Sequence, residues 1–460
     1  MLIKFSVSNF LSINEMQEFS MKANKTRKYS ERIYKNKTTK LTKCKSVFGA
    51  NASGKSNLVA AFQFMQDMIE DGLPRGFSTQ YFRLLNENQY LPSTFETELL
   101  LNNQKYIYGF SIILSEGAVQ NEWLYEISTT GINKLIFYRD ILKKEFIIGE
   151  YFKNKDAISK IETYGKDSLD ENDVLFLTVI NTNKSKMFTE NAELRIFKDI
   201  FTWFVFRLTI SNPSTILTGY PYFSDSNLNE IADLLNALGT GISDLKFVDV
   251  PKEIVKNKIP EKLYIKIIGD LEKQNVKAKK REKYQSPSGM VRGPKEFYTF
   301  EIDQNDTISI KTIEFSHENS SIFFNLREES DGTARLLDLI EILFKVSNDR
   351  IFIIDEIDRC LHPIMTEKIM ELFLKMAEYR NTQLIITSHE SRLLADDLLR
   401  NDEINFILKT PNGASIINPL EKYQLRADKK VYAALFDGTL DAIPNFNTTK
   451  LESLVQNSSH

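Results

Sequence analysis

Residues 45–57 read KSVFGANASGKSN, and this stretch decides the fold. Gly49 to Ser56 matches G-x-x-x-x-G-K-[ST] in every fixed position and follows a short run that we expect to be a strand. From Leu58 onward apolar residues recur at helical spacing, and Gly72-Leu73-Pro74 ends that pattern. This order of strand, glycine-containing loop and helix is what a phosphate-binding loop requires.

The residue types in this loop suit a bound nucleotide better than a simple glycine turn. Glycines let consecutive backbone N–H groups curl around a β-phosphate, and the helix that begins there adds the positive end of its dipole. Lys55 can neutralise β- and γ-phosphate oxygens, and the Ser56 hydroxyl can ligate Mg²⁺. The predicted ligands are ATP and Mg²⁺, and the predicted contacts are Gly49, Asn51, Ser53, Gly54, Lys55, Ser56 and Asn57.

An acidic pair follows a second apolar run. The run IFII at residues 351–354 leads directly into Asp355 and Glu356. A carboxylate at the end of a buried strand can hold Mg²⁺ through water, and a neighbouring glutamate can orient and partly deprotonate the attacking water. Many strands end in Asp-Glu, so this assignment depends on the phosphate loop upstream. We predict Asp355 as a metal-binding residue beside Ser56, and Glu356 as the catalytic base.

A histidine follows a third apolar run. Residues 383–386 lead into Thr387-Ser388-His389, so in a parallel sheet this histidine emerges at the same edge as the acidic pair. A histidine there can donate a hydrogen bond to a γ-phosphate or to the attacking water, although lone histidines are more often structural. We predict a catalytic role for His389. For His362 we expect packing or a contact between protomers.

Glu329-Ser330-Asp331-Gly332-Thr333 precedes a helix with a stripe of apolar residues. Serine at the start and glycine inside suit a helix N-terminus that binds an anion, although an ordinary helix cap is the simpler interpretation. The order of motifs along the chain favours the functional interpretation, since this segment lies between the phosphate loop and the acidic pair. Ser330, Gly332 and Thr333 are therefore predicted as further nucleotide contacts.

These motifs together resemble those of ABC-type ATPases related to RecF, SMC proteins and the OLD family, in particular a compact bacterial group of AAA-type ATPases. The resemblance implies that Ser330 and Gly332 of one protomer close over the γ-phosphate held by another, so that ATP joins a homodimer or a higher homo-oligomer. It covers nearly the whole chain and rests on NFLS at 9–12, GANASGKSN at 49–57, ESDGTARLL at 329–337, IDEIDRCLHP at 354–363 and TSHE at 387–390.

The sequence departs from the pattern of these ATPases at two places. The segment SDGT stands where transporter ATPases have a form richer in glycine and glutamine. The glutamine loop has no secure position, although Gln80 and Gln89 lie in the expected region. In addition, the stretch between Lys55 and Asp355 is too short for the long coiled-coil arm of an SMC protein, so a compact insertion is expected.

The expected fold is α/β: a P-loop ABC-type ATPase head with an N-terminal antiparallel β meander and a mainly helical insertion. Alternating runs between residues 94 and 150 predict the meander. We expect a first lobe at 1–182, the insertion at 183–298 and a second lobe at 299–460. Residues 251–298 combine several prolines with a basic run at 273–283, and we expect them to be mobile.

Composition excludes several classes of protein. With 42% hydrophobic and 26% charged residues, the 460-residue chain is neither disordered nor fibrous. The net charge of −3 gives no global attraction to nucleic acid, so any such contact needs a local patch. Cys44 and Cys360 lack metal-ligand spacing and fit a reducing cytoplasm. The N-terminal residues alternate like a strand rather than a signal peptide, and no stretch has the roughly 18 apolar residues that cross a bilayer.

The resemblance also implies a biological role. Related ATPases are subunits of bacterial phage-defence systems, such as the PARIS and RloA/RloB-type pairs, in which an effector nuclease, often of the TOPRIM fold, accompanies the ATPase. The segment after His389 is too short for a TOPRIM domain, and Asp396-Asp397 is expected to be a solvated helix face. The first hypothesis is thus an ATP-hydrolysing sensor and scaffold that controls a partner nuclease and responds to a nucleic acid or a phage protein.

Two other functions stay open. A RecF-like DNA-binding ATPase for repair or maintenance would use the basic run at 273–283, for which a solvated loop is the commoner explanation. The ATPase of a membrane transporter is disfavoured by the meander and the large insertion.

Overall fold

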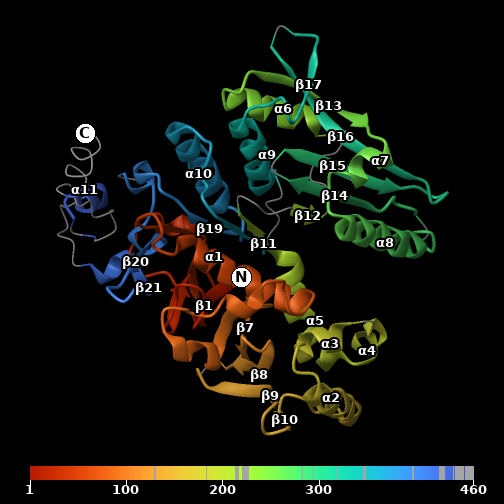
Figure 1. Cartoon of the computed structure of the whole chain (residues 1–460), viewed down its shortest axis with the longest axis vertical. Helices are drawn as coiled ribbons and strands as arrows, with labels where there is room; N and C mark the ends of the chain where they lie inside the picture. The colour runs from red at the N-terminus through yellow and green to blue at the C-terminus, as the bar shows by residue number, and fades with distance from the viewer. Residues whose placement is uncertain are drawn as a thin grey trace, which may run out of the picture. The chain divides into compact units, whose positions relative to one another are not determined.

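The computed structural model describes residues 1–128, 131–182, 184–212, 217–219, 227–281, 283–293, 295–318, 320–344, 349–395, 398–423, 430–438, 440 and 450. Asp396 and Asp397 lie outside the described residues. The chain divides into two compact units, the first made of Met1–Ile210, Ser347–Ile357 and Ala377–His460, the second of Ser211–Val346 and Asp358–Met376 (Figure 1).

The first unit contains the predicted antiparallel meander. Its seven-stranded sheet has the order β10-β9-β8-β7-β6-β1-β2, in which the N-terminal strand pairs with the first strand of the meander. The alternation of apolar residues in the sequence matches the buried face of this sheet. The strands are β1 (Leu2–Ser8), β2 (Gln17–Ser20), β6 (Ser93–Leu101), β7 (Gln104–Ile113), β8 (Ala118–Ile127), β9 (Asn133–Asp140) and β10 (Glu145–Ile148).

A second sheet in this unit carries the motifs. Its order is β11-β18-β19-β5-β20-β21, and β5 lies parallel to both β19 and β20. Strand β18 is parallel to β19, whereas β21 is antiparallel to β20. The strands are β5 (Cys44–Phe48), β11 (Leu208–Ser211), β18 (Ile351–Ile354), β19 (Gln383–Thr387), β20 (Ile404–Lys409) and β21 (Ser415–Pro419).

Helix α1 (Lys55–Glu70) joins the two sheets in one hydrophobic core. Phe62 stacks on Phe5 of β1 with ring centroids 3.9 Å apart, and Phe64 stacks on Phe95 of β6. The same cluster includes Val47 of β5. The helix that begins at the phosphate loop is therefore anchored on both sheets. The remaining elements of the unit are β3 (Ile33–Lys35), β4 (Lys40–Thr42), α2 (Lys155–Asp167), α3 (Phe176–Asn181), α4 (Ser185–Glu190), α5 (Arg195–Thr202) and α11 (Val431–Phe436).

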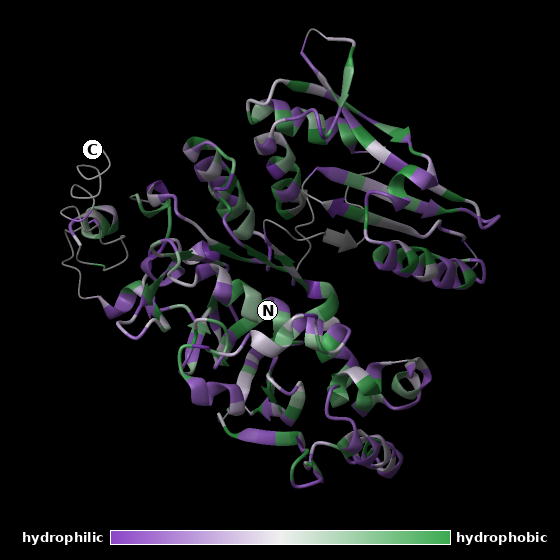
Figure 2. Ribbon diagram, in the orientation of Figure 1, coloured by the Kyte–Doolittle hydropathy of each residue, from purple (hydrophilic) through white to green (hydrophobic). Residues whose placement is uncertain are grey.

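The second unit is built on another antiparallel sheet, with the order β12-β14-β15-β16-β13 and β17 paired to β16. Hydrophobic and hydrophilic residues alternate along its elements (Figure 2). The strands are β12 (Leu217–Gly219), β13 (Ile242–Asp249), β14 (Ser288–Gly293), β15 (Glu296–Ile302), β16 (Ile308–His317) and β17 (Phe323–Asn325), and the helices are α6 (Leu228–Ala237), α7 (Lys252–Lys256), α8 (Glu261–Ala278), α9 (Asp331–Phe344) and α10 (Pro363–Ala377).

The mixed α/β fold is confirmed, and the predicted helices of the insertion are present. Strands β12 to β15 were not predicted, and residues 251–298 form α7, α8, β14 and β15 rather than the expected mobile segment. Strand β12 has only 3 residues, and β14 begins and ends beside glycine or proline, so the alternation in these two strands is too brief to stand out from a loop. None of the helices in the described part of the chain has both the length and the hydrophobicity needed to cross a bilayer.

Candidate functional site

The phosphate loop connects β5 to α1, as the sequence predicts. Gly54 is the N-cap of α1 with φ at 109°, and a side chain there would collide with the hydroxyls of Ser415 and Ser12. A side chain at Gly49 would collide with the Ile407 carbonyl. Both glycines are therefore required by this backbone path, since a Cβ has no room.

Lys55 lies in the first turn of α1 and is only 5% exposed. Its Nζ donates to the carbonyl oxygens of Gly49 at 2.9 Å and Ala50 at 3.1 Å. Ser56, the next residue, is exposed. The lysine ammonium is thus held inside the curve of the loop, where a phosphate oxygen could replace a carbonyl as its acceptor.

Two serines from distant segments support the loop. Asn57 Nδ2 donates to Ser12 Oγ at 2.6 Å, and the Ser12 and Ser415 hydroxyls lie 2.7 Å apart. The Ser415 hydroxyl also donates to the Ser53 carbonyl at 2.5 Å. Ser12 belongs to the NFLS stretch, for which no role was predicted, and Ser415 was not predicted because no motif marks it. Both serines therefore help to fix the path of the loop.

The turn that carries Ser12 also contacts one of the two candidate glutamines. The backbone N–H of Leu11 donates to the Gln80 carbonyl at 2.5 Å. The Gln89 carbonyl instead accepts a hydrogen bond from Ser115. Of the two candidate glutamines, Gln80 is therefore the one whose backbone contacts the turn that carries Ser12.

The acidic pair follows β18, at the same sheet edge as the loop. Asp355 is 4% exposed, and its Oδ1 accepts a hydrogen bond from the Thr387 hydroxyl at 2.5 Å. Glu356 has a left-handed backbone with φ at 49°, and its N–H donates to the same hydroxyl at 2.8 Å. The end of β19 thus holds both acidic residues through the side chain of Thr387, for which no role was predicted from the sequence.

His389 stands two residues beyond β19 and is exposed. Strand β19 lies between β5 and β18, with Thr387 opposite Val47 and Ile386 opposite Ile354. Because the three strands are parallel, their carboxyl ends meet at one edge. The structure therefore brings together the phosphate loop, Asp355, Glu356 and His389, as predicted from the sequence.

Ser330, Gly332 and Thr333 belong to the second unit, at the start of α9. The Ser330 hydroxyl accepts the Thr333 N–H at 3.0 Å and lies 2.9 Å from the Thr333 hydroxyl. This is a standard N-terminal helix cap. A Cβ on Gly332 would lie 2.9 Å from the Cys360 carbonyl, so the glycine permits close packing on the loop after the acidic pair.

A lysine from the turn between β14 and β15 contacts this helix start. Lys295 Nζ donates to the Glu329 carbonyl at 2.7 Å and pairs with Asp331 Oδ1 at 2.9 Å. On the other side, His317 Nε2 lies 2.8 Å from Glu329 Oε1. Neither Lys295 nor His317 was predicted as part of the site, since each lies outside the motif and reaches it only through the sheet.

Arginines reinforce the first turns of α9. Arg292 of β14 is almost fully buried, donates to the Ala334 carbonyl at 2.9 Å and pairs with Asp338. Arg335 shares that carboxylate at 3.6 Å. Burial lowers the pKa of the Arg335 guanidinium, and Asp338 offsets part of this effect. The helix start is therefore fastened to the β14–β15 hairpin by Arg292 and Lys295.

Comparison with known proteins gives one family and a set of similar folds. Residues 46–179 and 220–395 match the family described as "AAA domain, putative AbiEii toxin, Type IV TA system". The comparison with curated proteins gave no match.

Three similar solved structures are SMC heads. The SMC head domain from Thermotoga maritima is 13% identical, with 91% of this chain and 98% of that chain covered and a TM-score of 0.31. The Smc head domain with an extended coiled coil bound to the C-terminal domain of ScpA, derived from Pyrococcus furiosus, is 14% identical, with 92% and 97% covered and a TM-score of 0.34. The SmcHead bound to the C-winged helix domain of ScpA is 11% identical, with 90% and 96% covered and a TM-score of 0.36.

Proposed function

Because the chain belongs to this AAA-domain family, whose match spans residues 46–179 and 220–395, we propose that it binds and hydrolyses ATP with Mg²⁺. The observation that carries the proposal is the order of strands β5, β19 and β18. Their parallel carboxyl ends place a phosphate loop, a histidine and an acidic pair at one edge of a sheet. Ligands bind at such an edge in open α/β sheets.

The residues of this edge fit a magnesium nucleotide. Gly49 and Gly54 leave no space for a side chain, so the loop backbone can approach a phosphate closely. The Ser53 hydroxyl is buried and finds no hydrogen-bond partner within the described residues. Ser56 and Asp355 supply the oxygen ligands that Mg²⁺ prefers, and the bound ion would neutralise charge on the phosphates.

Each remaining side chain has a role that its position allows. Lys55 exchanges its two loop carbonyls for phosphate oxygens. Glu356 accepts the proton of the attacking water, with its backbone held by Thr387. His389 donates a hydrogen bond to the γ-phosphate or to that water.

The start of α9 completes the site from a second copy of the chain. Ser330, Gly332 and Thr333 form a capped helix N-terminus, a common location for an anion. In this proposal ATP joins two protomers, each of which supplies half of the site. The family resemblance supports this arrangement, since the signature acts across the dimer in such ATPases.

Nucleotide hydrolysis by the purified chain tests the proposal. We expect Mg²⁺-dependent release of phosphate from ATP, and loss of ATP binding in Lys55→Ala. Lys155→Ala, on the exposed face of α2, serves as a control with the same chemical change. Equal ATP binding by Lys55→Ala and the wild type would refute the nucleotide site.

We also propose that the ATPase acts in the cytoplasm as a sensor and scaffold for an effector nuclease in antiviral defence. The family description names a putative toxin of a type IV toxin–antitoxin system. Such a system consists of two proteins, which supports a role for this chain together with one partner protein. Co-expression with the product of the adjacent gene, followed by purification and phage plating, tests this role. We expect the pair to copurify and to protect cells only with an intact Lys55. Protection by the Lys55→Ala pair would contradict it.

The second candidate function is a RecF-like DNA-binding ATPase. The observation that favours it is the distribution of lysines on α8 in the second unit.

A further inference from the structure

Helix α8 (Glu261–Ala278) has one side fixed against the sheet of the second unit. Leu271 lies in the hydrophobic cluster formed with residues of β14, β15 and β16. Asn275 is fully buried, and its Nδ2 donates to the Asp303 carbonyl and to Asp306 Oδ1, both at 2.9 Å. Tyr284 donates to the Asn275 side-chain oxygen at 2.8 Å. These contacts set the rotation of the helix about its own axis.

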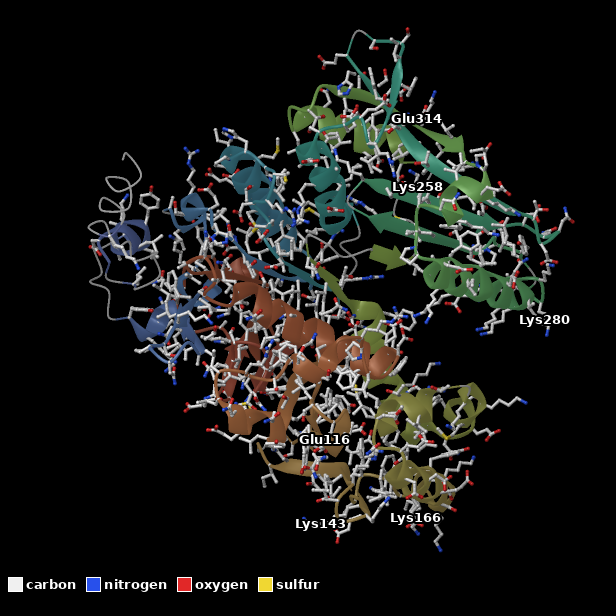
Figure 3. The ribbon with its side chains drawn as sticks, in the orientation of Figure 1. Glu116, Lys143, Lys166, Lys258, Lys280 and Glu314 are labelled. Carbon is white, nitrogen blue, oxygen red and sulfur yellow. The ribbon has the colours of Figure 1, made fainter. Side chains whose placement is uncertain are left out.

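The opposite side of α8 carries a row of lysines. At about 100° per residue, Lys262, Lys266, Lys273 and Lys277 fall within a sector about 60° wide. All four are exposed, and Lys280 continues the row just past the end of the helix. Figure 3 shows Lys280 at the outer end of α8 with its side chain directed away from the ribbon. We call these five residues the lysine face.

Acidic side chains of α8 lie outside this sector. Glu261 and Glu272 lie roughly 80° or more away from it around the helix, towards the side that packs on the sheet. Asp270 lies at the margin and approaches Lys273 only to 3.7 Å, with both side chains more than half exposed. An exposed pair of this kind neutralises little charge in water. The lysine face is therefore predominantly positive, and Asp270 is the acidic residue of α8 that lies nearest to it.

The lysine face differs from the basic run at 273–283 seen in the sequence. Lys279 belongs to the run but lies on the packed side of the helix, where its Nζ pairs with both oxygens of Asp306 at 2.6 Å. Lys262 and Lys266 lie outside the run but on the face. The fold thus selects a set of lysines that the linear sequence does not show.

A glycine lies at the margin of the lysine face, about 20° outside the sector of the lysines. Gly269 stands between Lys266 and Lys273, and a Cβ built on it would meet no atom within 4 Å. Glycine weakens the interior of a helix, so neither helix stability nor packing accounts for it. It leaves the backbone of α8 open to close approach by a partner.

We propose that the lysine face binds the sugar–phosphate backbone of nucleic acid. The face is about 27 Å long at 1.5 Å per residue, a length along which one strand of a duplex presents about eight phosphates. Its cations are all lysines, which act as point charges and do not read bases with a bidentate fork. Binding is therefore independent of base sequence, and it does not depend on the nucleotide site of the first unit.

Salt-dependent binding of the full chain to a fluorescent duplex of about 30 base pairs tests the proposal. Anisotropy is measured without ATP from about 50 to about 200 mM salt. Five phosphate contacts predict that log Kobs falls against log salt with a slope of about −4.5. The variant Lys266→Gln/Lys273→Gln/Lys277→Gln should make the slope of log Kobs against log salt less negative by about 3. It should also weaken binding at the lowest salt concentration by about 100-fold.

Two matched controls separate the lysine face from charge in general. Lys279→Gln lies in the same segment but off the face, and should bind within about twofold of the wild type. Lys155→Gln/Lys160→Gln/Lys166→Gln makes the same charge change on α2 of the first unit, and should also leave binding unchanged. Loss of binding in either control to the same extent as in the face variant would overturn the proposal.

Other outcomes would also overturn it. These are an absence of wild-type binding to duplex and to single strands, an unchanged salt slope in the face variant, or equal competition by polyglutamate of matched charge, which would indicate an acidic protein partner. A single-stranded probe with a shallower slope, about 0.7 per contact, would identify the preferred form of nucleic acid and support the proposal. Lys55→Ala should retain binding, so failure of the ATPase proposal and failure of this one are distinguishable.

Discussion

The Thr387 hydroxyl donates a hydrogen bond to Oδ1 of Asp355 at 2.5 Å. The hydroxyl oxygen of Thr387 in turn accepts the backbone N–H of Glu356 at 2.8 Å, and the Thr387 carbonyl accepts the N–H of Ile357 at 3.1 Å. One residue at the end of β19 therefore orients the whole turn after β18. His389 follows two residues later, so a shift at the end of β19 would move the acidic pair and the histidine together.

Replacing Thr387 by valine tests this coupling. Valine keeps the shape but leaves the Glu356 N–H and the Asp355 carboxylate without this partner, at a cost of about 1–3 kcal/mol. We expect the turnover rate to fall about tenfold or more and the Mg²⁺ concentration for half-maximal rate to rise, as measured in ATPase assays. Thr387→Ser keeps the hydroxyl and should restore both quantities. If valine lowers only the melting temperature, Thr387 has a structural role alone.

Removing the carboxylate of Glu356 should separate nucleotide binding from hydrolysis. Glu356→Gln keeps the size of the side chain but cannot accept a proton, so we expect ATP binding without turnover. Because ATP then persists in the site, the variant should form a stable dimer in the presence of ATP and Mg²⁺. Size-exclusion chromatography with and without ATP measures this change. Hydrolysis by the glutamine variant at the wild-type rate would remove Glu356 from its proposed role.

Lys295 and Asp331 should be coupled in their effect on ATP. The Asp331 carboxylate lies in the first turn of α9, where it would oppose an approaching phosphate, and Lys295 offsets its charge. Lys295→Met should raise the half-saturating ATP concentration about tenfold. Asp331→Gly alone should have a small effect and should rescue Lys295→Met in the double variant. Additive effects in this double-mutant cycle would show that Lys295 does not act through Asp331.

Glu403 should make stability depend on pH. It is fully buried beside the start of β20, and burial raises the pKa of its carboxyl to about 7, an effect increased by Asp402 and reduced by a backbone hydrogen bond and by Arg32 and Arg400. Because the folded-state pKa is raised, the folded protein binds this proton more tightly than the unfolded chain does. The stabilisation is complete below about pH 4.5 and is lost as the pH rises through about 7.

Urea unfolding of the wild type and Glu403→Gln across this range measures the effect. The wild-type free energy of unfolding should fall by about 3 kcal/mol more than that of the glutamine variant between pH 4.5 and pH 8. Parallel curves for the two proteins would contradict the assignment.

Local patterns in the sequence were sufficient for much of the candidate site. The phosphate loop, the run before Asp355 and the run before His389 are each contiguous, and each ends an apolar strand. Strands of this type pair in parallel with their carboxyl ends together, so the edge that joins Lys55, Asp355 and His389 followed from the pattern. The meander was predictable for a similar reason, because alternation of apolar and polar residues along a long strand indicates that one face of the sheet is buried.

The sequence by itself therefore determined which motifs exist and which sheet edge they share. Only the tertiary structure decided what supports them: Ser415 reaches Ser12 across 403 positions of the chain, and Lys295 reaches Asp331 through a hairpin that was not predicted. It also decided which lysines of α8 face outward, since Asn275 sets the rotation of the helix. The physical reason is that periodicity is a local property, whereas a side-chain hydrogen bond between remote segments depends on how whole strands and helices pack.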